Sequence, residues 1–284
     1  MGEMKEILPD FHIYVPILNE EELISSTINA LLEVFDASQI TVLDLNSTDD
    51  SVNRVPRGVS VVQYEFPANK PAGRSYTDMK NEYSRRQKWV FWVDGDEIYT
   101  TESLLRLKKW TVEAIGGGHL KTQCYRVYWR YVIGDPDRGY ETSREFLYAG
   151  SKLFNSEIYW FRRAYPREVM ARREDATVTG VSKGRREDFN GVWCWHGSML
   201  RRSSVYTTGD RKKAGSKKAL LYSPIPGGTS KSQRFGEKTR YELLSWDHTG
   251  YLPWENGYDT EAEQGWVAWN FNTGGEDSGT WPTS

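Results

Sequence analysis

The sequence has only two cysteines, four histidines and no long hydrophobic run. Cys124 and Cys194 stand far apart and form no CxxC pair, which argues against a disulfide framework and a cysteine-based zinc site. Nowhere do about 18 apolar residues follow one another, so no membrane span is predicted. The N-terminal Met1–Glu6 has no apolar signal-peptide core. We therefore expect a cytoplasmic protein.

Positive charge is missing from the last part of the chain and concentrated just before it. Residues 241–284 have no Lys or Arg and 8 acidic residues, whereas residues 160–240, the basic block, have 19 Lys and Arg against 7 Asp and Glu. This segregation favours an anionic partner. Aromatic residues lie among the basic ones, and phosphate contacts with base stacking would suit a nucleic acid. A solvated face that offsets the acidic tail is the other interpretation.

Apolar runs alternate with helical spacing over the first 120 residues. The predicted strands are 11–17, 40–45, 59–64 and 89–93, and the predicted helices are 20–35, 72–86 and 102–114. Fully apolar strands that alternate with helices predict an α/β fold with a mainly parallel sheet flanked by helices. Ligands of such sheets bind at the carboxyl ends of the strands. Further strand-like segments at 124–132, 153–154 and 192–195 have an order that the sequence does not reveal.

The acidic turn Asp94-Gly95-Asp96-Glu97 directly follows the apolar strand at 89–93. Two carboxylates one residue apart place several oxygens where a hard divalent cation can be held. Such a cation neutralises the charge that develops on a diphosphate leaving group. An acidic turn is also a common structural feature, so its meaning depends on other segments.

Three segments, in order and at suitable spacing, resemble the GT-A-fold, family-two-like glycosyltransferases. Val15–Glu21 resembles the first strand and its Asn-Glu turn, Ile40–Ser51 resembles the second strand and its Ser-Thr-Asp turn, and Trp89–Glu97 resembles the aromatic strand with its DxD motif. The resemblance covers residues 11–100. It implies a GT-A, Rossmann-like fold and transfer of a sugar from a nucleotide-diphosphate sugar, preferably a UDP-sugar, with Mn²⁺ or Mg²⁺ as cofactor.

The same resemblance assigns roles to five residues. Pro16 and Glu20 are expected beside the base and ribose of the donor, and Asp44 is expected to accept a hydrogen bond from the base. Asp94 would lie near the ribose or the metal, and Asp96 would be a metal ligand. Ordinary interpretations stay open, with Glu20 as a helix-end charge and Asp44 as a turn cap.

A less specific resemblance concerns Lys152–Asn155 and Tyr165–Val169, where relatives carry an aromatic strand and then a His-Glu step. Arg167 stands where that His would be. Glu168 is therefore the candidate general base for direct displacement with inversion, which requires a carboxylate near the acceptor hydroxyl. Asp188, or its neighbour Glu187, is the alternative base. A surface salt bridge is the other interpretation of Glu168.

His196 follows the strand-like run Val192–Trp195. Many relatives add a late histidine to the metal shell, and an imidazole beside carboxylates suits Mn²⁺ better than Ca²⁺. A structural histidine is the alternative interpretation. The predicted metal ligands are thus Asp96, Asp94 and His196.

The chain is expected to divide into a nucleotide-sugar-binding half at 1–120, a basic acceptor-binding and catalytic half at 121–240, and an acidic, Trp-rich extension at 241–284. For the acceptor we favour a hydroxymethylated pyrimidine in DNA, as in phage-type DNA modification in a host cytoplasm, bound through the basic block. The alternative is a bacterial surface-polysaccharide or lipid-linked glycan transferase in peripheral contact with a membrane. A non-catalytic, nucleic-acid-binding relative is the second alternative.

Overall fold

One mixed sheet with helices on both faces forms the centre of the molecule. The computed structural model describes residues 7–117, 124–135, 139–143, 147–163, 170–173, 187–200 and 246–249. Its elements in chain order are β1 (Phe11–Ile17), α1 (Ile24–Val34), the 3-10 helix η1 (Ala37–Gln39), β2 (Ile40–Asp44), β3 (Ser60–Gln63), α2 (Ala72–Ser84), β4 (Trp89–Trp92), β5 (Glu97–Tyr99), α3 (Thr101–Ile115), β6 (Cys124–Asp135), β7 (Gly139–Ser143), β8 (Leu147–Asn155), β9 (Tyr159–Phe161), β10 (Met170–Arg172), β11 (Glu187–Leu200) and β12 (Trp246–Thr249).

The sheet has the strand order β12-β7-β6-β8-β4-β1-β2-β3. The strands β4, β1, β2 and β3 run parallel to one another, as the alternation of strands and helices predicted. The later aromatic segments extend this sheet through antiparallel pairs of β8 with β4 and of β6 with β8. The long strand β11 lies parallel to β6 and antiparallel to β5. The predicted α/β fold, a mainly parallel central sheet flanked by helices, is confirmed.

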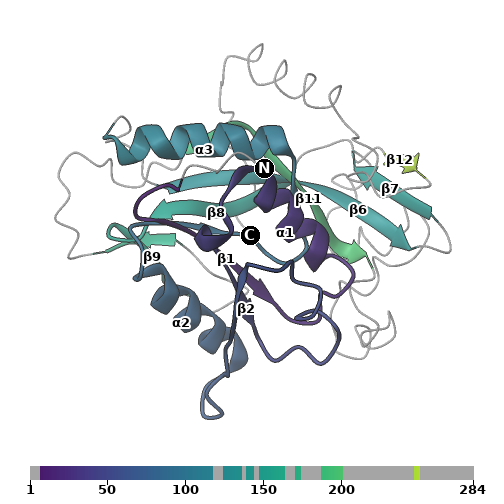
Figure 1. Cartoon of the computed structure of the whole chain (residues 1–284), viewed down its shortest axis with the longest axis horizontal. Coiled ribbons are helices and arrows are strands. Elements are labelled where there is room, and N and C mark those ends of the chain that lie inside the picture. The colour runs from purple at the N-terminus through teal and green to yellow at the C-terminus, as the bar shows by residue number, and fades with distance from the viewer. Residues whose placement is uncertain are drawn as a thin grey trace.

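Helices cover the two faces of the sheet because successive side chains of each strand point to opposite sides. Ile13 and Val15 of β1 face a core that includes residues of α1 and α3. Tyr14, between them, faces a second core with Met79 and Tyr83 of α2. Figure 1 shows α3 and α2 on opposite sides of the strands.

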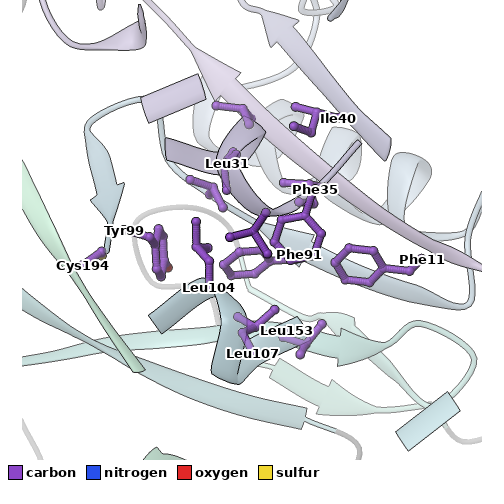
Figure 2. Packing of buried hydrophobic residues seen from close by; sticks show 14 of the residues in the cluster. Phe11, Leu31, Phe35, Ile40, Phe91, Tyr99, Leu104, Leu107, Leu153 and Cys194 are labelled. Carbon is purple, nitrogen blue, oxygen red and sulfur yellow. The ribbon is translucent and has the colours of Figure 1, made fainter. Parts of the chain in front are cut away.

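The larger core is filled by aromatic and branched side chains from the sheet, α1 and α3 (Figure 2). The rings of Phe11 and Phe35 stack with centroids 5.4 Å apart, and Phe91 meets Tyr99 edge-on at 5.3 Å. Burial of one such large side chain stabilises a fold by roughly 1.5–3 kcal/mol. This core therefore anchors β1, β4 and β5, whose ends carry the acidic residues.

The acidic start of the predicted first helix is different in the structure. Helix α1 begins at Ile24, and Glu20, Glu21 and Glu22 precede it. The backbone of Glu20 donates to Ser51 Oγ at 2.7 Å, and Glu21 Oε2 accepts from the backbone of Asp50 at 3.0 Å. These bonds hold the acidic residues against the loop after β2 instead of in a helical turn.

The short strand β5 was not predicted, because three residues show no periodicity. Within the described part of the chain, no helix is both long and apolar enough to cross a membrane.

Candidate functional site

Three polar turns meet along one edge of the parallel part of the sheet. Ile17 at the end of β1 lies opposite Asp44 at the end of β2, and Val93 after β4 donates its backbone N–H to Tyr14 O at 3.1 Å. The carboxyl ends of the three strands are therefore aligned. The turns that carry Glu20, Asp44 and Asp94 follow from these ends, at the edge where such sheets bind ligands.

The turn after β1 is fastened to the loop after β2. Asn19 has a left-handed backbone with φ 56°, a conformation that asparagine tolerates better than most residues. Its Oδ1 accepts from the backbone of Thr48 at 2.7 Å, and its own N–H donates to Ser47 Oγ at 3.0 Å. The two loops therefore form one unit that fixes the position of Glu20.

Gly95 lets the turn after β4 approach Glu20 closely. A Cβ at this position would lie 2.9 Å from Ile17 Cγ2 and 3.1 Å from Glu20 Cγ, too close for any larger residue without a shift. The carbonyl of Gly95 accepts a hydrogen bond from Thr27 Oγ1 of α1 at 2.9 Å. The glycine of the acidic turn thus has a packing role, and Glu20 lies against this turn.

A buried lysine bridges two carboxylates of the acidic turn. Lys152 Nζ lies 2.8 Å from Asp94 Oδ2 and 2.7 Å from Glu97 Oε1. On β8, Leu153 and Ser151 pair with consecutive residues of β6, so Lys152 is the extra residue of a β-bulge. Bulges re-aim side chains near functional sites. The Glu97 side chain is fully buried, whereas 35% of the Asp94 side chain is exposed.

The three groups of this cluster have perturbed ionisation. Burial raises the pKa of Glu97 to about 7, although the Lys152 ammonium works against that shift. Burial alone would also raise the pKa of Asp94, but Lys152 and Lys80 outweigh it and hold that pKa below its usual value. Burial would lower the pKa of Lys152, but the two carboxylates outweigh it and raise that pKa. Lys152 is therefore charged at neutral pH, Asp94 is ionised, and Glu97 is near its midpoint.

Strand β11 brings His196 to the acidic turn. Antiparallel pairing with β5 sets His196 opposite Glu97, and the backbone of Gly197 donates to Asp96 O at 2.8 Å. His196 Nε2 then lies 3.7 Å from Asp96 Oδ1, and both residues are buried. Two segments about 100 residues apart in sequence thus place an imidazole and a carboxylate side by side.

The spacing of Asp96 and His196 is close to that of two ligands of one divalent ion. Ligand atoms about 2.1 Å from one metal lie about 3.0 Å apart at an octahedral angle and about 3.4 Å apart at a tetrahedral angle, so the observed 3.7 Å requires a small approach of the two side chains. Mg²⁺ commonly takes only one or two protein ligands and completes its shell with substrate phosphates and water. Among the described residues, no group of three or more His, Cys, Asp or Glu could hold a metal alone. Asp94 differs from the other two predicted ligands because its Oδ2 pairs with Lys152.

The other predicted donor-site residues lie on neighbouring strands. Asp44 is buried, and its Oδ1 accepts from the backbone of Ser47 at 3.0 Å, which is the turn-cap contact that the sequence allowed. Pro16 is buried in β1 opposite Leu43. Asp44 thus lies at the same edge as Glu20.

Of the two candidate bases, the structure describes only the backbone of Asp188. Glu168 is outside the described residues. Asp188 belongs to β11, where its backbone pairs with Arg126. Asp188 and His196 pair with Arg126 and Tyr131 of β6, which are five residues, or roughly 17 Å, apart along that strand. Of the basic block, the structure describes the side chains of only four cationic residues other than histidine, Arg162, Arg163, Arg172 and Arg173.

No role was predicted for Lys152, Trp129 or Lys80 from the sequence. Lys152 starts the aromatic segment at 152–155, and a lysine in a run that is otherwise apolar must pair with acidic groups when buried. The role of Lys152 as an ion-pair partner could therefore have been predicted from the sequence. Trp129 and Lys80 had none, because their contacts with Glu97 and with the ring of Phe161 join distant segments.

Comparisons with known proteins found similar solved structures but no matching family model and no matching curated protein. The chain is similar to glucosyl-3-phosphoglycerate synthase from Mycobacterium tuberculosis in complex with Mn²⁺, UDP and glucosyl-3-phosphoglycerate, with a TM-score of 0.32 and 22% identity over 42% of this chain and 44% of that one. A second structure of that synthase, with Mg²⁺ and UDP, matches with TM-score 0.32 and 22% identity over 42% and 43% of the two chains. The chain thus spans less than half the length of these structures.

Proposed function

We propose that this chain is a metal-dependent glycosyltransferase that moves a sugar from a nucleotide-diphosphate sugar, preferably a UDP-sugar, to an acceptor hydroxyl. One observation carries the proposal. Asp96 and His196 meet 3.7 Å apart at the carboxyl ends of parallel strands, beside the turns of Glu20 and Asp44. A metal-bound diphosphate and a nucleoside need such an edge, with metal ligands at one point and polar acceptors along it.

The roles divide along the sheet edge. Pro16, Glu20 and Asp44 receive the base and ribose of the donor, since their strands lie next to each other. Asp96 and His196 would hold Mn²⁺ or Mg²⁺, which would neutralise charge on the departing diphosphate. Asp94, which is fixed by Lys152, faces the ribose or the metal-bound phosphates.

The transfer is a single displacement with inversion. The acceptor oxygen attacks the anomeric carbon, the bond from that carbon to the β-phosphate oxygen breaks, and a carboxylate takes the hydroxyl proton. Glu168 is the proposed base and Asp188 the alternative. The pairing of β11 with β6 separates Asp188 from His196 by roughly 17 Å, which argues against Asp188 as the base.

The proposed acceptor is a hydroxymethylated pyrimidine in DNA. The basic block supports this choice, and its exposed members Arg162 and Arg163 follow directly after β9. Cationic side chains that contact phosphates position a nucleic acid without reading its sequence. The base would need to leave the stack to expose its hydroxyl to a buried site.

The test is mass spectrometry of nucleosides after incubation of DNA with the full chain, Mn²⁺ and a panel of nucleotide sugars. The expected result is a hexose or pentose mass increment on the hydroxymethylated base and none on plain DNA. Transfer only to a lipid-linked or free glycan would remove the DNA acceptor but keep the glycosyltransferase. Release of nucleoside diphosphate that is equal for wild type and Asp96→Asn would remove the metal-dependent enzyme. Asp78→Asn, which alters an exposed ion pair with Lys70, is the matched control.

A further inference from the structure

Trp129 of β6 connects His196 to the ion cluster of the acidic turn. Its indole ring lies face to face with the imidazole of His196, with centroids 4.0 Å apart and planes 5° from parallel. Its Nε1 donates to Glu97 Oε1 at 2.7 Å, the same oxygen that pairs with Lys152. A continuous chain of contacts therefore runs from the Lys152 ammonium to the His196 ring.

We propose that Trp129 is a positioning residue that fixes the ring plane of His196 for metal binding. This proposal rests on the metal site of the proposed function. The lone pair of an imidazole nitrogen lies in the ring plane, so a histidine binds a metal only when its ring is turned correctly. Partners outside the ligand shell commonly fix this orientation, and their loss typically weakens metal binding by about 10–100-fold.

The stacked geometry limits rotation of the His196 ring. Trp193 and Trp195 meet edge-on at 82°, whereas Trp129 and His196 are stacked with their planes nearly parallel. A nearly parallel pair resists rotation of the imidazole about its bond to Cβ, because any turn drives the ring into the indole. The indole itself cannot turn without breaking its hydrogen bond to the fully buried Glu97. His196 is thus held on one face while its Nε2 points toward Asp96.

Mn²⁺ affinity in the presence of saturating UDP tests the proposal, measured from the electron paramagnetic resonance signal of free Mn²⁺. Trp129→Leu removes the stack and the hydrogen bond, and we expect the dissociation constant to rise about 10-fold or more. Trp129→Phe keeps a ring but loses the bond to Glu97, and we expect a smaller rise. Trp110→Phe removes an indole that packs against Trp89 and Tyr125 in the larger core, and it should leave the affinity unchanged.

A double-mutant cycle separates positioning from general damage. In a His196→Ala background, Trp129→Leu should no longer change the dissociation constant, because the ligand that it positions is absent. An equal effect in both backgrounds, or no effect in wild type, would overturn the proposal and leave the proposed function intact. If the wild-type protein with UDP binds no Mn²⁺, the positioning role of Trp129 and the proposed metal-dependent function are both wrong. Unfolding curves show which variants fold. If Trp129→Leu does not fold, the same double-mutant cycle is carried out with Trp129→Phe, and its result tests the proposal.

Discussion

Replacement of Lys152 by methionine isolates the contribution of the buried ion cluster to stability. The variant keeps the length and apolar stem of the side chain but removes the charge that faces Asp94 and Glu97. At pH 6, Glu97 is protonated in the folded wild type because burial raises its pKa to about 7. The free energy of unfolding lost at this pH then comes mainly from the charge-assisted hydrogen bonds of Lys152, about 2 kcal/mol.

The loss should grow above pH 7. Wild-type Glu97 releases its proton there, so its contribution to stability becomes independent of pH. Without Lys152 the pKa of Glu97 rises further, and the folded variant keeps a proton that the unfolded chain has lost. Stability of the variant then falls by about 1.4 kcal/mol per pH unit relative to wild type. At pH 8.5 we expect a total loss of about 4 kcal/mol, within the range typical of a broken buried ion pair.

Urea unfolding curves at pH 6 and pH 8.5 measure both quantities. Lys70→Met is the control, because Lys70 and Asp78 form an exposed pair that should contribute under about 1 kcal/mol at either pH. The double variant Lys152→Met, Glu97→Gln should lose the pH dependence. A destabilisation that is the same at the two pH values, or below about 1 kcal/mol at both, would show that Lys152 does not stabilise the ionised form of Glu97.

Three further predictions concern the same edge of the sheet. Asp96→Asn should lower sugar transfer by at least about 100-fold, because the metal supplies several kcal/mol of transition-state stabilisation, and steady-state release of nucleoside diphosphate measures the loss. Gly95→Ala should destabilise the fold by about 1–3 kcal/mol in thermal unfolding, since the new methyl meets Ile17 and Glu20, whereas Gly116→Ala, with its nearest atoms at 3.5 Å, should be near neutral. Wild-type stability should fall as pH rises from about 4.5 to about 7, because the folded state binds the Glu97 proton more tightly than the unfolded chain does, and Glu97→Gln should reduce that slope.

The local part of the fold was readable from the sequence. Hydrophobic periodicity predicted the strands β1 to β4 and the helices α1 to α3, because the apolar pattern of each repeats within its own segment, whereas the three residues of β5 are too few to show one. The start of α1 was wrong, since Glu20 and Glu21 bond to Ser51 and Asp50 of another loop. A local charge pattern cannot predict such contacts between loops that are distant in sequence.

The candidate site was readable only in part, for a related reason. Asp96 and His196 were both singled out, but their approach depends on the register between β5 and β11. The role of Lys152 depends on one extra residue in β8, which turns the lysine toward Asp94. A one-residue slip would turn each side chain to the other face of the sheet, and sequence patterns do not determine register to that accuracy.

The pairing of β5 with β11 also orders events during synthesis. Asp96 leaves the ribosome about 100 residues before His196, which at about 5–20 residues per second is roughly 5–20 s. Through about half of that interval the chain has Asp94 and Glu97 but no Lys152 to neutralise them. We expect the acidic turn to stay hydrated and open until β8 and β11 join the sheet, so this edge forms later than the parallel strands beside it.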